Sequence, residues 1–252
     1  MNQALPGSAP PACTRRPIIA IDGPAGAGKS TVARHIARHF RLLNLESGAM
    51  YRAFALKALR SKVALEDAGG LLALSGETSI HLEPGEQGNR VFLDGAEVTS
   101  QLREADVTDG ASRVSVHPPI RAWMVRLQQE LGASGGVVME GRDIGTVVFP
   151  NADVKIFLDA AAEVRGLRRY EQIGQIGQIG PAGAKEPSSS PEPDAVVREL
   201  RARDERDRSR ADSPLKPAND AILLDSTHMT LEEAVAKAEA IVTEKLSISP
   251  AH

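Results

Sequence analysis

Four short apolar runs lie at wide intervals along the chain, and each is followed by polar or helical sequence. Runs of this length and composition suit strands that are buried on both faces of a parallel sheet. The runs are PIIAIDG (17–23), GVVMEG (136–141), VKIFLDA (154–160) and AILLDST (221–227). Because strand and helix alternate, the pattern predicts an α/β, doubly wound fold, with about five parallel strands and helices on both faces.

Helical periodicity is clearest directly after the first run, over residues 29–40. The apolar residues that recur there at every fourth position are Val32, Ile36 and Phe40. His35 and His39 fall on the other side, and we interpret both as surface residues rather than ligands. A second helical stretch covers 230–246, with Thr230 as its N-cap, and we expect only a packing role for it. Its apolar stripe is Leu231, Val235, Ala238 and Val242.

Two segments depart from the alternation of strand and helix. Residues 79–99 alternate apolar and polar positions around Gly-containing turns, which predicts a small antiparallel excursion. Residues 172–193 repeat Gln-Ile-Gly three times and then run into Pro and Ser. Glycines at this spacing disfavour a helix, so we expect a mobile loop from about 172 to 193.

The strongest local motif is GPAGAGKS, residues 23–30, between the first strand and the first helix. It satisfies the P-loop pattern G-x-x-x-x-G-K-[ST], whose glycines let successive N–H groups surround phosphate oxygens. Lys29 is expected to reach the β and γ phosphates, and the Ser30 hydroxyl to hold Mg²⁺. The sequence therefore predicts a site for ATP. The residues assigned to it are Gly23, Pro24, Ala25, Gly26, Ala27, Gly28, Lys29, Ser30 and Thr31.

A P-loop leaves the second substrate open, since GTPases, motors and small-molecule kinases all use one. The absence of an Asn-Lys-x-Asp guanine-reading sequence disfavours a GTPase, and 252 residues leave little room for motor domains. A regulator that binds ATP without turnover is a further alternative. Composition adds a preference for anions, because the chain carries 22 arginines against 8 lysines.

Composition also bounds the partners and the compartment. A net charge of −3 with 3% aromatic residues argues against bulk nucleic-acid binding. Cys13 is the single cysteine, which excludes an internal disulfide and favours a reducing cytoplasm. We find no apolar stretch of signal-peptide or membrane-spanning length, and we read residues 1–16 as a flexible tail.

The segment RARDERDRSR, residues 201–210, is almost entirely charged. Opposite charges three and four residues apart stabilise a solvated helix, and this is the simplest interpretation. Arg203, Asp207 and Arg210, however, are spaced i, i+4 and i+7, which places them on one side of a helix. That side is a candidate ligand-facing surface, while Arg201, Glu205 and Arg208 are expected to face water.

Several further motifs occur in order: LESGAMYR, SRVSVHPPIR, MEGRDIGTVVFPNADVKIFLDA, RDERDRSR and PLKPANDAILLDST. With IAIDGPAGAGKST, they resemble the bacterial cytidylate kinase family, which phosphorylates CMP and dCMP with ATP. The resemblance extends from about residue 17 to 246. It implies a P-loop core (17–60, 101–163 and 195–252), an acceptor-side subdomain (61–100) and a lid (164–194). It also implies a cytoplasmic, monomeric enzyme that requires Mg²⁺ and binds neither membrane nor nucleic acid.

The resemblance implies roles for individual residues. Ser47, Arg121 and Asp143 match the family's cytosine-binding positions. The positions that hold the acceptor phosphate are Arg52, Arg142 and Arg210, with Tyr51 beside them, and those around the ribose are Ser112, Arg203 and Asp207. The lid arginines are Arg165, Arg168 and Arg169, which act with Lys29 on the transferred group.

Three departures from the family pattern are visible. The P-loop ends in Ser30, Glu46 stands where the family often has Asp, and the Gln-Ile-Gly stretch lengthens the lid connection. None of them removes a group that the chemistry needs. A different acceptor, such as UMP, AMP or a small metabolite like shikimate, remains the main alternative. For Asp143, the alternative is a structural role: it would pair with the adjacent Arg142 and orient the loop, and other groups would then select the base.

Overall fold

A computed structural model describes residues 16–85, 88–179, 193–210 and 212–248. Its centre is a sheet of five strands in the order β2-β6-β1-β7-β8, and every neighbouring pair is parallel. The strands are β1 (Arg16–Asp22), β2 (Leu43–Glu46), β6 (Gly135–Gly141), β7 (Val154–Asp159) and β8 (Ile222–Asp225). The predicted doubly wound α/β fold is therefore confirmed.

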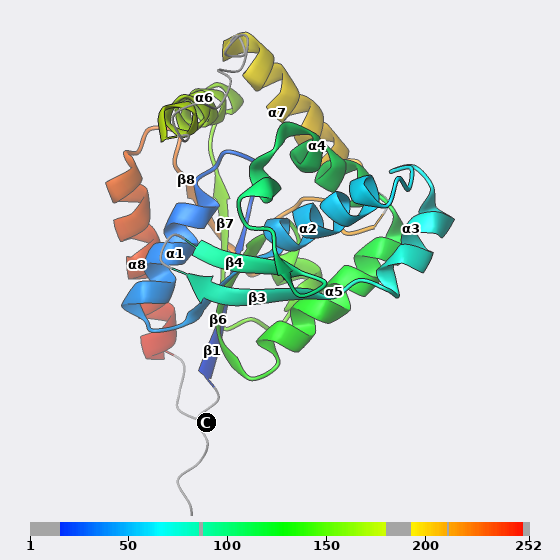
Figure 1. Cartoon of the computed structure of the whole chain (residues 1–252). Helices are drawn as coiled ribbons and strands as arrows, with labels where there is room; N and C mark the ends of the chain where they lie inside the picture. The colour runs from blue at the N-terminus through cyan, green and yellow to red at the C-terminus, as the bar shows by residue number, and fades with distance from the viewer. Residues whose placement is uncertain (1–15, 86–87, 180–192, 211, 249–252) are drawn as a thin grey trace, which may run out of the picture.

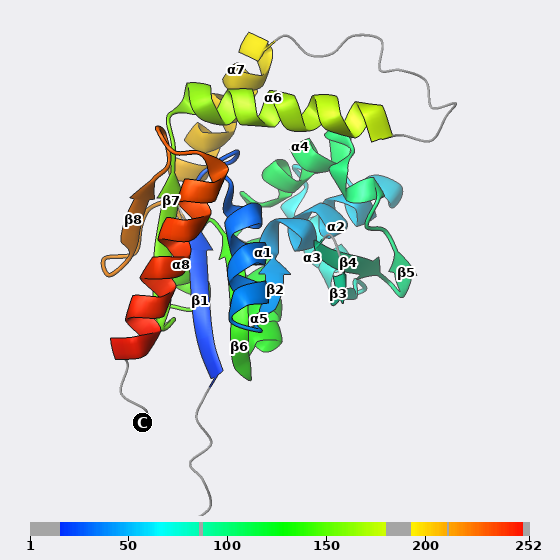
Figure 2. The ribbon, with the colours of Figure 1, turned by 90° about the vertical axis from the view of Figure 1, so that its left-hand side faces the viewer.

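Helices cover both faces of this sheet (Figure 2). Ile19 and Ile21 of β1 pack in a cluster with α1 (Lys29–His39) and α8 (Leu231–Ile248). Ile18 and Ala20 point the other way, toward α2 (Ser47–Arg60), α4 (Ala105–Val114) and α5 (Pro118–Gly132). Because successive side chains of a strand alternate between faces, a continuous apolar run supplies both layers of core.

A small antiparallel sheet lies beside the main one, in front of it in Figure 1. It consists of β3 (Ile80–Gly85), β4 (Gly88–Leu93) and β5 (Ala96–Glu97), within the segment expected to be antiparallel. The Asn89 side chain attaches this sheet to β2, since its Oδ1 accepts from the Glu46 N–H at 3.1 Å and its Nδ2 donates to the Asn44 carbonyl at 2.8 Å. The small sheet is thus held against the main sheet.

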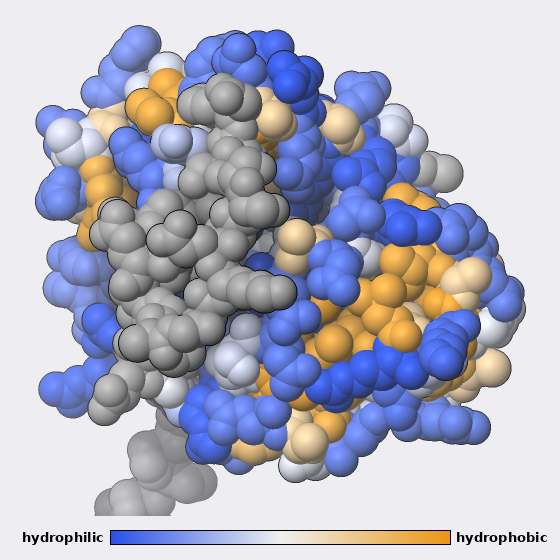
Figure 3. Space-filling model, turned by 45° about the horizontal axis from the view of Figure 1, so that its top comes forward, coloured by the Kyte–Doolittle hydropathy of each residue, from blue (hydrophilic) through white to orange (hydrophobic). Residues whose placement is uncertain are grey.

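Helix α3 (Ala68–Ser75) precedes the small sheet and is short and apolar. Within this helix, Leu71 is buried, whereas Leu72 has 47% of its surface exposed. Figure 3 shows an apolar area on the right-hand side of the molecule, the side on which Figure 1 places α3. The Asp67 side chain caps this helix by accepting from the Gly70 N–H at 3.0 Å.

Helices α6 (Ala162–Ile179) and α7 (Pro193–Arg208) pack against each other above the carboxyl ends of the strands (Figures 1 and 2). The packing is close, because a Cβ on Gly166 would stand 2.3 Å from Val197 Cγ2. The expectation of a non-helical loop from residue 172 was wrong as far as residue 179. Glycine costs a helix only about 1 kcal/mol per residue, and α6 continues in spite of it. Residues 180–192 lie outside the described part.

Two further differences from the sequence prediction concern boundaries. Strand β2 was not among the expected apolar runs, because Leu45 is its one fully buried residue. Helix α7 ends at Arg208, so Arg210 lies beyond the helix and not within it, as its spacing from Arg203 and Asp207 had predicted. Two irregular helices complete the order: the 3-10 helix η1 (Gln101–Arg103) and the π-helix η2 (Ile144–Val148). Within the described ranges, no helix is long and apolar enough to cross a membrane.

Candidate active site

The P-loop connects the end of β1 to α1, and its backbone requires glycine. Gly23, Gly26 and Gly28 have φ values of 149°, 77° and 93°, which L side chains rarely adopt. A Cβ on Gly23 would lie 1.9 Å from the Leu158 carbonyl oxygen, and one on Gly26 would lie 2.9 Å from the Arg165 carbonyl oxygen. The loop is therefore enclosed by β7 and α6; residues 23–28 form it, and Lys29, Ser30 and Thr31 are the first residues of α1.

Lys29 is buried, with 7% of its surface exposed, and its Nζ donates to the Pro24 carbonyl at 2.7 Å. Burial lowers its pKa well below the ordinary value, and the positive charge of Arg142 lowers it further, whereas Glu140 raises it. An ammonium group has three N–H donors, and the Pro24 carbonyl takes one of them, so donors remain for an anion. The side chain thus lies inside the loop that the sequence assigned to phosphate.

Two buried carboxylates at this site were missed by sequence analysis. Glu140 is the last residue but one of β6, level with Ile21 of β1 and Glu46 of β2. Burial raises its pKa to about 7 and the negative charge of Glu46 adds to this, whereas Lys29 and the Ser30 hydroxyl lower it. Its Oε1 has no hydrogen-bond partner. A Val-Val-Met-Glu strand end is the one signal that could have found it, since catalytic groups gather at the carboxyl ends of parallel strands.

Asp22 is the second missed carboxylate, and it joins the P-loop strand to the loop after β6. Its Oδ1 accepts from the Ile144 N–H at 2.8 Å, and its Oδ2 accepts from the Gly145 N–H at 2.7 Å. Burial raises its pKa to about 6 against these two hydrogen bonds. Because Asp22 directly precedes Gly23, this contact fixes the Asp143 loop relative to the phosphate-binding loop.

Of the three residues assigned to the base, Arg121 of α5 contacts Asp143, and Ser47 of α2 contacts the end of β6. Arg121, 3% exposed, forms an ion pair with Asp143, 6% exposed, and donates from Nη1 to the Ser115 carbonyl at 3.3 Å. Ser47 begins α2 and donates to the Glu140 carbonyl at 2.7 Å. Tyr51 lies one turn further on, with the Arg121 guanidinium 5.9 Å from its ring centre. Asp143 therefore pairs with Arg121, and not with its chain neighbour Arg142 as the alternative required.

The arginines assigned to the phosphate and ribose converge from four segments. Arg142 Nε donates to Asp207 Oδ2 at 2.8 Å, and Arg210 forms an ion pair with the other oxygen of the same carboxylate. Arg52 lies 3.5 Å from Glu46. Burial lowers the pKa of Arg203 to about 9, and the charges of Arg142, Arg52 and Arg169 lower it further. Cations that repel one another in a buried region stabilise an anion placed among them.

Unpartnered polar atoms mark the same region. Nine buried side-chain nitrogen and oxygen atoms of the described residues have no hydrogen-bond partner, and five belong to residues assigned to the acceptor. Buried polar groups are normally hydrogen bonded, so a cluster of exceptions points to a polar ligand. The five atoms are Arg52 Nε, Ser112 Oγ, Arg121 Nε, Arg203 Nε and Arg210 Nε.

One side of α7 is a solvated, charged face, as the sequence predicted, because Arg201, Glu205 and Arg208 are exposed. Asp207, by contrast, has 1% of its surface exposed. The helix thus presents one face to water and one to the site, and the Arg201–Glu163 ion pair on the outer face joins it to α6.

The three arginines assigned to the lid make different contacts. Arg165 is buried and donates to the carbonyls of Ala25, at 2.9 Å, and Ala160, at 2.8 Å, and its Nη2 lies 2.7 Å from Asp204 Oδ2. Arg168 donates to the Ser226 carbonyl at 2.9 Å, on the β8–α8 connection. Arg169 is close enough to Arg52 and Arg203 for its charge to lower their pKa values. Of the three, Arg169 is the one whose charge acts on Arg52 and Arg203.

The parallel sheet and the glycine loop between β1 and α1 define a P-loop phosphotransferase. A model of the cytidylate kinase family matches residues 19–244, so the chain belongs to the cytidylate kinase family. It is 42% identical over 231 residues to a cytidylate kinase of Pasteurella multocida, covering 92% of this chain and 97% of that one. A cytidylate kinase of a Geobacillus species is 45% identical over 228 residues, covering 90% and 97%.

Among solved structures, a shikimate kinase from Acinetobacter baumannii in complex with shikimate aligns with a TM-score of 0.43. Its sequence is 17% identical, and the alignment covers 95% of this chain and 98% of that one.

Proposed function

We propose that this chain transfers the γ-phosphoryl group of ATP to CMP or dCMP, giving ADP and CDP or dCDP. Family membership supports the reaction, and the cluster of unpartnered acceptor-side atoms is the observation that carries the assignment of the site. The second anion site separates a kinase from a regulator that only binds ATP, because a binder has no use for a further group of buried arginines.

The cytosine is assigned to Asp143, Arg121 and Ser47. Cytosine offers an N4 amino donor where uracil offers an O4 acceptor, so a carboxylate at that edge accepts from the first and repels the second. Arg121 compensates the charge of Asp143 in a region from which water is excluded. The pair thus gives the pocket a fixed hydrogen-bond acceptor, and this favours CMP over UMP.

The acceptor phosphate is assigned to Arg52, Arg142 and Arg210, and the ribose to Arg203, Asp207 and Ser112. Arg142 and Arg210 share the Asp207 carboxylate, which leaves their remaining N–H groups for a ligand. Tyr51 supports this group through its ring beside Arg121. Arginines from α2, the loop after β6 and the region of α7 must act together, because a phosphate and a triphosphate repel until their charge is neutralised.

The reaction needs no side-chain nucleophile. A phosphate oxygen of CMP attacks the γ-phosphorus in line and forms the new P–O bond. The bond from the γ-phosphorus to its bridging oxygen breaks, and that electron pair leaves with ADP. Lys29 stabilises charge on the β and γ oxygens, the P-loop N–H groups hold the β-phosphate, and Arg169 reaches the transferred group with Arg165 and Arg168 when the lid closes.

The oxygen donors at the P-loop fit Mg²⁺, the divalent ion that prefers hydroxyl, carboxylate and phosphate ligands. Ser30 and Glu140 are the residues that would hold it, and the unpartnered Glu140 Oε1 supports this assignment. When bound, the ion neutralises charge on the β and γ oxygens. A monomeric state, a cytoplasmic location and the lid boundaries stay predictions.

Steady-state kinetics with a panel of acceptors test the proposal. With ATP and Mg²⁺ held constant, CMP and dCMP are expected to give the highest kcat/KM among CMP, dCMP, UMP, AMP and shikimate. A higher kcat/KM for any of the last three would overturn the assignment of the acceptor. ATP binding without acceptor-dependent ADP release would favour the regulator instead.

A further inference from the structure

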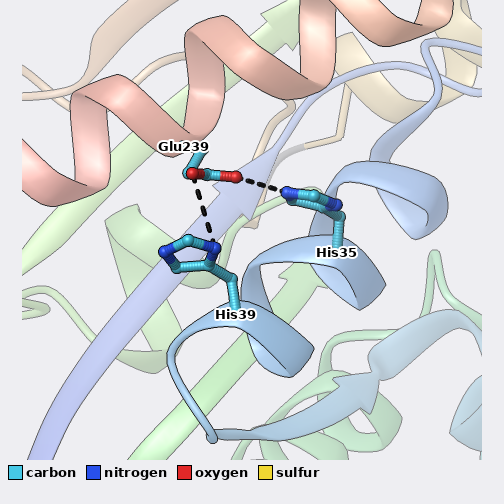
Figure 4. Close-up of side chains that lie close together, drawn as sticks. All are labelled: His35, His39 and Glu239. Carbon is cyan, nitrogen blue, oxygen red and sulfur yellow. Dashed lines mark hydrogen bonds and ion pairs between the residues drawn. The ribbon is translucent and has the colours of Figure 1, made fainter.

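Outside the kinase site, two histidines of α1 and a glutamate of α8 converge (Figure 4). His35 Nε2 lies 2.5 Å from Glu239 Oε2, and His39 Nδ1 lies 3.4 Å from Glu239 Oε1. Their candidate ligand atoms all lie within 4.8 Å of one another. The two helices bring these side chains together across 204 positions of sequence.

The positions of the histidines follow from helix geometry. His35 and His39 are four residues apart and therefore lie on the same side of α1, where their rings stack with centroids 6.2 Å apart. The neighbouring Val32 and Ile36 are buried and pack this helix onto the sheet, which fixes the outer face relative to α8. The histidines are solvent-accessible, as the sequence predicted, with 41% and 49% of their side chains exposed.

We propose that His35, His39 and Glu239 form a binding site for a divalent transition-metal ion of the zinc class. Three protein ligands of the His2Glu type, with water in the fourth position, are an established zinc arrangement. Bonds of this kind separate two ligand atoms of a tetrahedral ion by about 3.3 Å. The His39–Glu239 distance of 3.4 Å already has this value, and His35–Glu239 has to open from 2.5 Å.

The donor set also selects the kind of ion. Imidazole nitrogens suit Zn²⁺, Ni²⁺ and Cu²⁺, whereas Mg²⁺ and Ca²⁺ prefer all-oxygen sites. The ion can approach from solvent, because a groove of about 530 Å³ between α1 and α8 is lined by both His35 and Glu239. Arg34 and Arg38 line the same groove and oppose a cation, so one carboxylate and two neutral imidazoles predict moderate affinity.

Binding at this position would connect α8 to the helix that begins at the P-loop. Lys29 is the first residue of α1, and His35 follows it after less than two turns. An ion bound to the folded chain alone stabilises it by mass action. Helix α8, for which the sequence predicted only packing, would then hold a ligand as well.

Isothermal titration calorimetry with Zn²⁺ tests the proposal on the untagged full-length chain, at pH 7.5 and without nucleotide. The chain carries Cys13→Ser, so that the single thiol is not a source of binding. One Zn²⁺ per chain is expected, and Mg²⁺ in excess is expected not to compete. His39→Gln and Glu239→Gln should each weaken binding more than tenfold, since loss of an outer hydrogen-bond partner alone costs about 10- to 100-fold.

The matched control is His81→Gln. The His81 side chain is 62% exposed and lies 3.7 Å from Glu83. Among the described residues, it belongs to no group of three that could hold an ion. This variant should bind Zn²⁺ like the parent. Zn²⁺ should also raise the melting temperature of the parent and of His81→Gln, but not that of His39→Gln, while all three keep equal Mg²⁺-dependent kinase activity when Zn²⁺ is absent.

Absence of a binding isotherm would overturn the proposal. So would equal affinity in the parent, His39→Gln and Glu239→Gln, because the ion would then bind elsewhere. Each variant's melting temperature with Zn²⁺ is compared with that of the same variant without Zn²⁺. A variant that is less stable because it has lost the His35–Glu239 contact therefore does not imitate a loss of Zn²⁺ binding.

Discussion

Asp143 gives the sharpest test of how the base is recognised. Its carboxylate is buried and paired with Arg121, so its replacement by alanine would leave a buried guanidinium without a counter-charge. Breaking a buried pair in this way costs about 3–5 kcal/mol and would mix stability with selectivity. Asp143→Asn also removes the charge, but it keeps the shape and an oxygen that can still accept a hydrogen bond from Arg121, so it disturbs the stability less than alanine.

The expected size of the effect follows from the hydrogen bond that changes. An asparagine can rotate to accept from the N4 amino group of CMP or to donate to the O4 of UMP, whereas the carboxylate can only accept. Reading one base edge is worth about 1–3 kcal/mol, so the ratio of kcat/KM for CMP over UMP should fall by about 5- to 150-fold. Most of this change should come from a loss with CMP.

The assay is steady-state ADP release with each acceptor, and the control is Asp204→Asn. Asp204 forms a comparably buried pair with Arg165 at 2.7 Å but is not assigned to the base. This control should lower kcat/KM for CMP and UMP in equal proportion. If Asp143→Asn also lowered both equally, Asp143 would be structural and the reasoning about base recognition would be refuted.

Three further predictions concern catalysis and stability. Lys29→Ala should keep the fold, measured by circular dichroism, but abolish turnover, and a near-normal rate would contradict the P-loop assignment. Arg168→Ala and Arg169→Ala should each lower kcat more than they raise the KM for CMP, because lid arginines act on charge that develops during transfer; an effect confined to KM would contradict this role. Glu140→Gln should raise the free energy of unfolding of the ligand-free chain relative to the parent, and this difference should be larger at pH 8 than at pH 5 by up to about 3 kcal/mol, measured by urea unfolding.

The sign of the Glu140 prediction follows from its raised pKa. The unfolded carboxyl loses its proton near 4.5, whereas the folded one keeps it until about 7. Unfolding therefore releases a proton between these values, and the stability of the parent falls as the pH rises through this window. Glutamine does not titrate, so the free-energy difference between variant and parent should grow from pH 5 to pH 8. An unchanged difference would show that Glu140 is not buried as an acid.

Much of the fold follows from local sequence. The apolar runs are long enough to predict four of the five parallel strands, and the P-loop motif predicts its own backbone because Gly23 and Gly26 have no room for a Cβ. Strand β2 could not be predicted, since its pairing with β6, and not its own composition, makes it a strand. Helix α6 likewise continues through glycines that local propensity would place in a loop.

The site shows where sequence reasoning ends. Parallel register across three strands brings Glu140 beside Ile21 and Glu46, and no local pattern encodes that alignment. The partner of Asp143 is Arg121, 22 positions away, rather than the adjacent arginine. The spacing of Arg203, Asp207 and Arg210 correctly placed Asp207 on the buried side, although α7 ends before Arg210.

The central claim is direct transfer of the γ-phosphoryl group from ATP to CMP. ATP labelled with a radioactive γ-phosphorus makes this transfer measurable. With Mg²⁺ and CMP, the account predicts that the label appears in CDP at the rate at which ADP forms. Protein with Lys29→Ala, prepared in the same way, excludes a contaminating kinase. Label recovered as inorganic phosphate, or CDP formed at an equal rate by the variant preparation, would contradict the account.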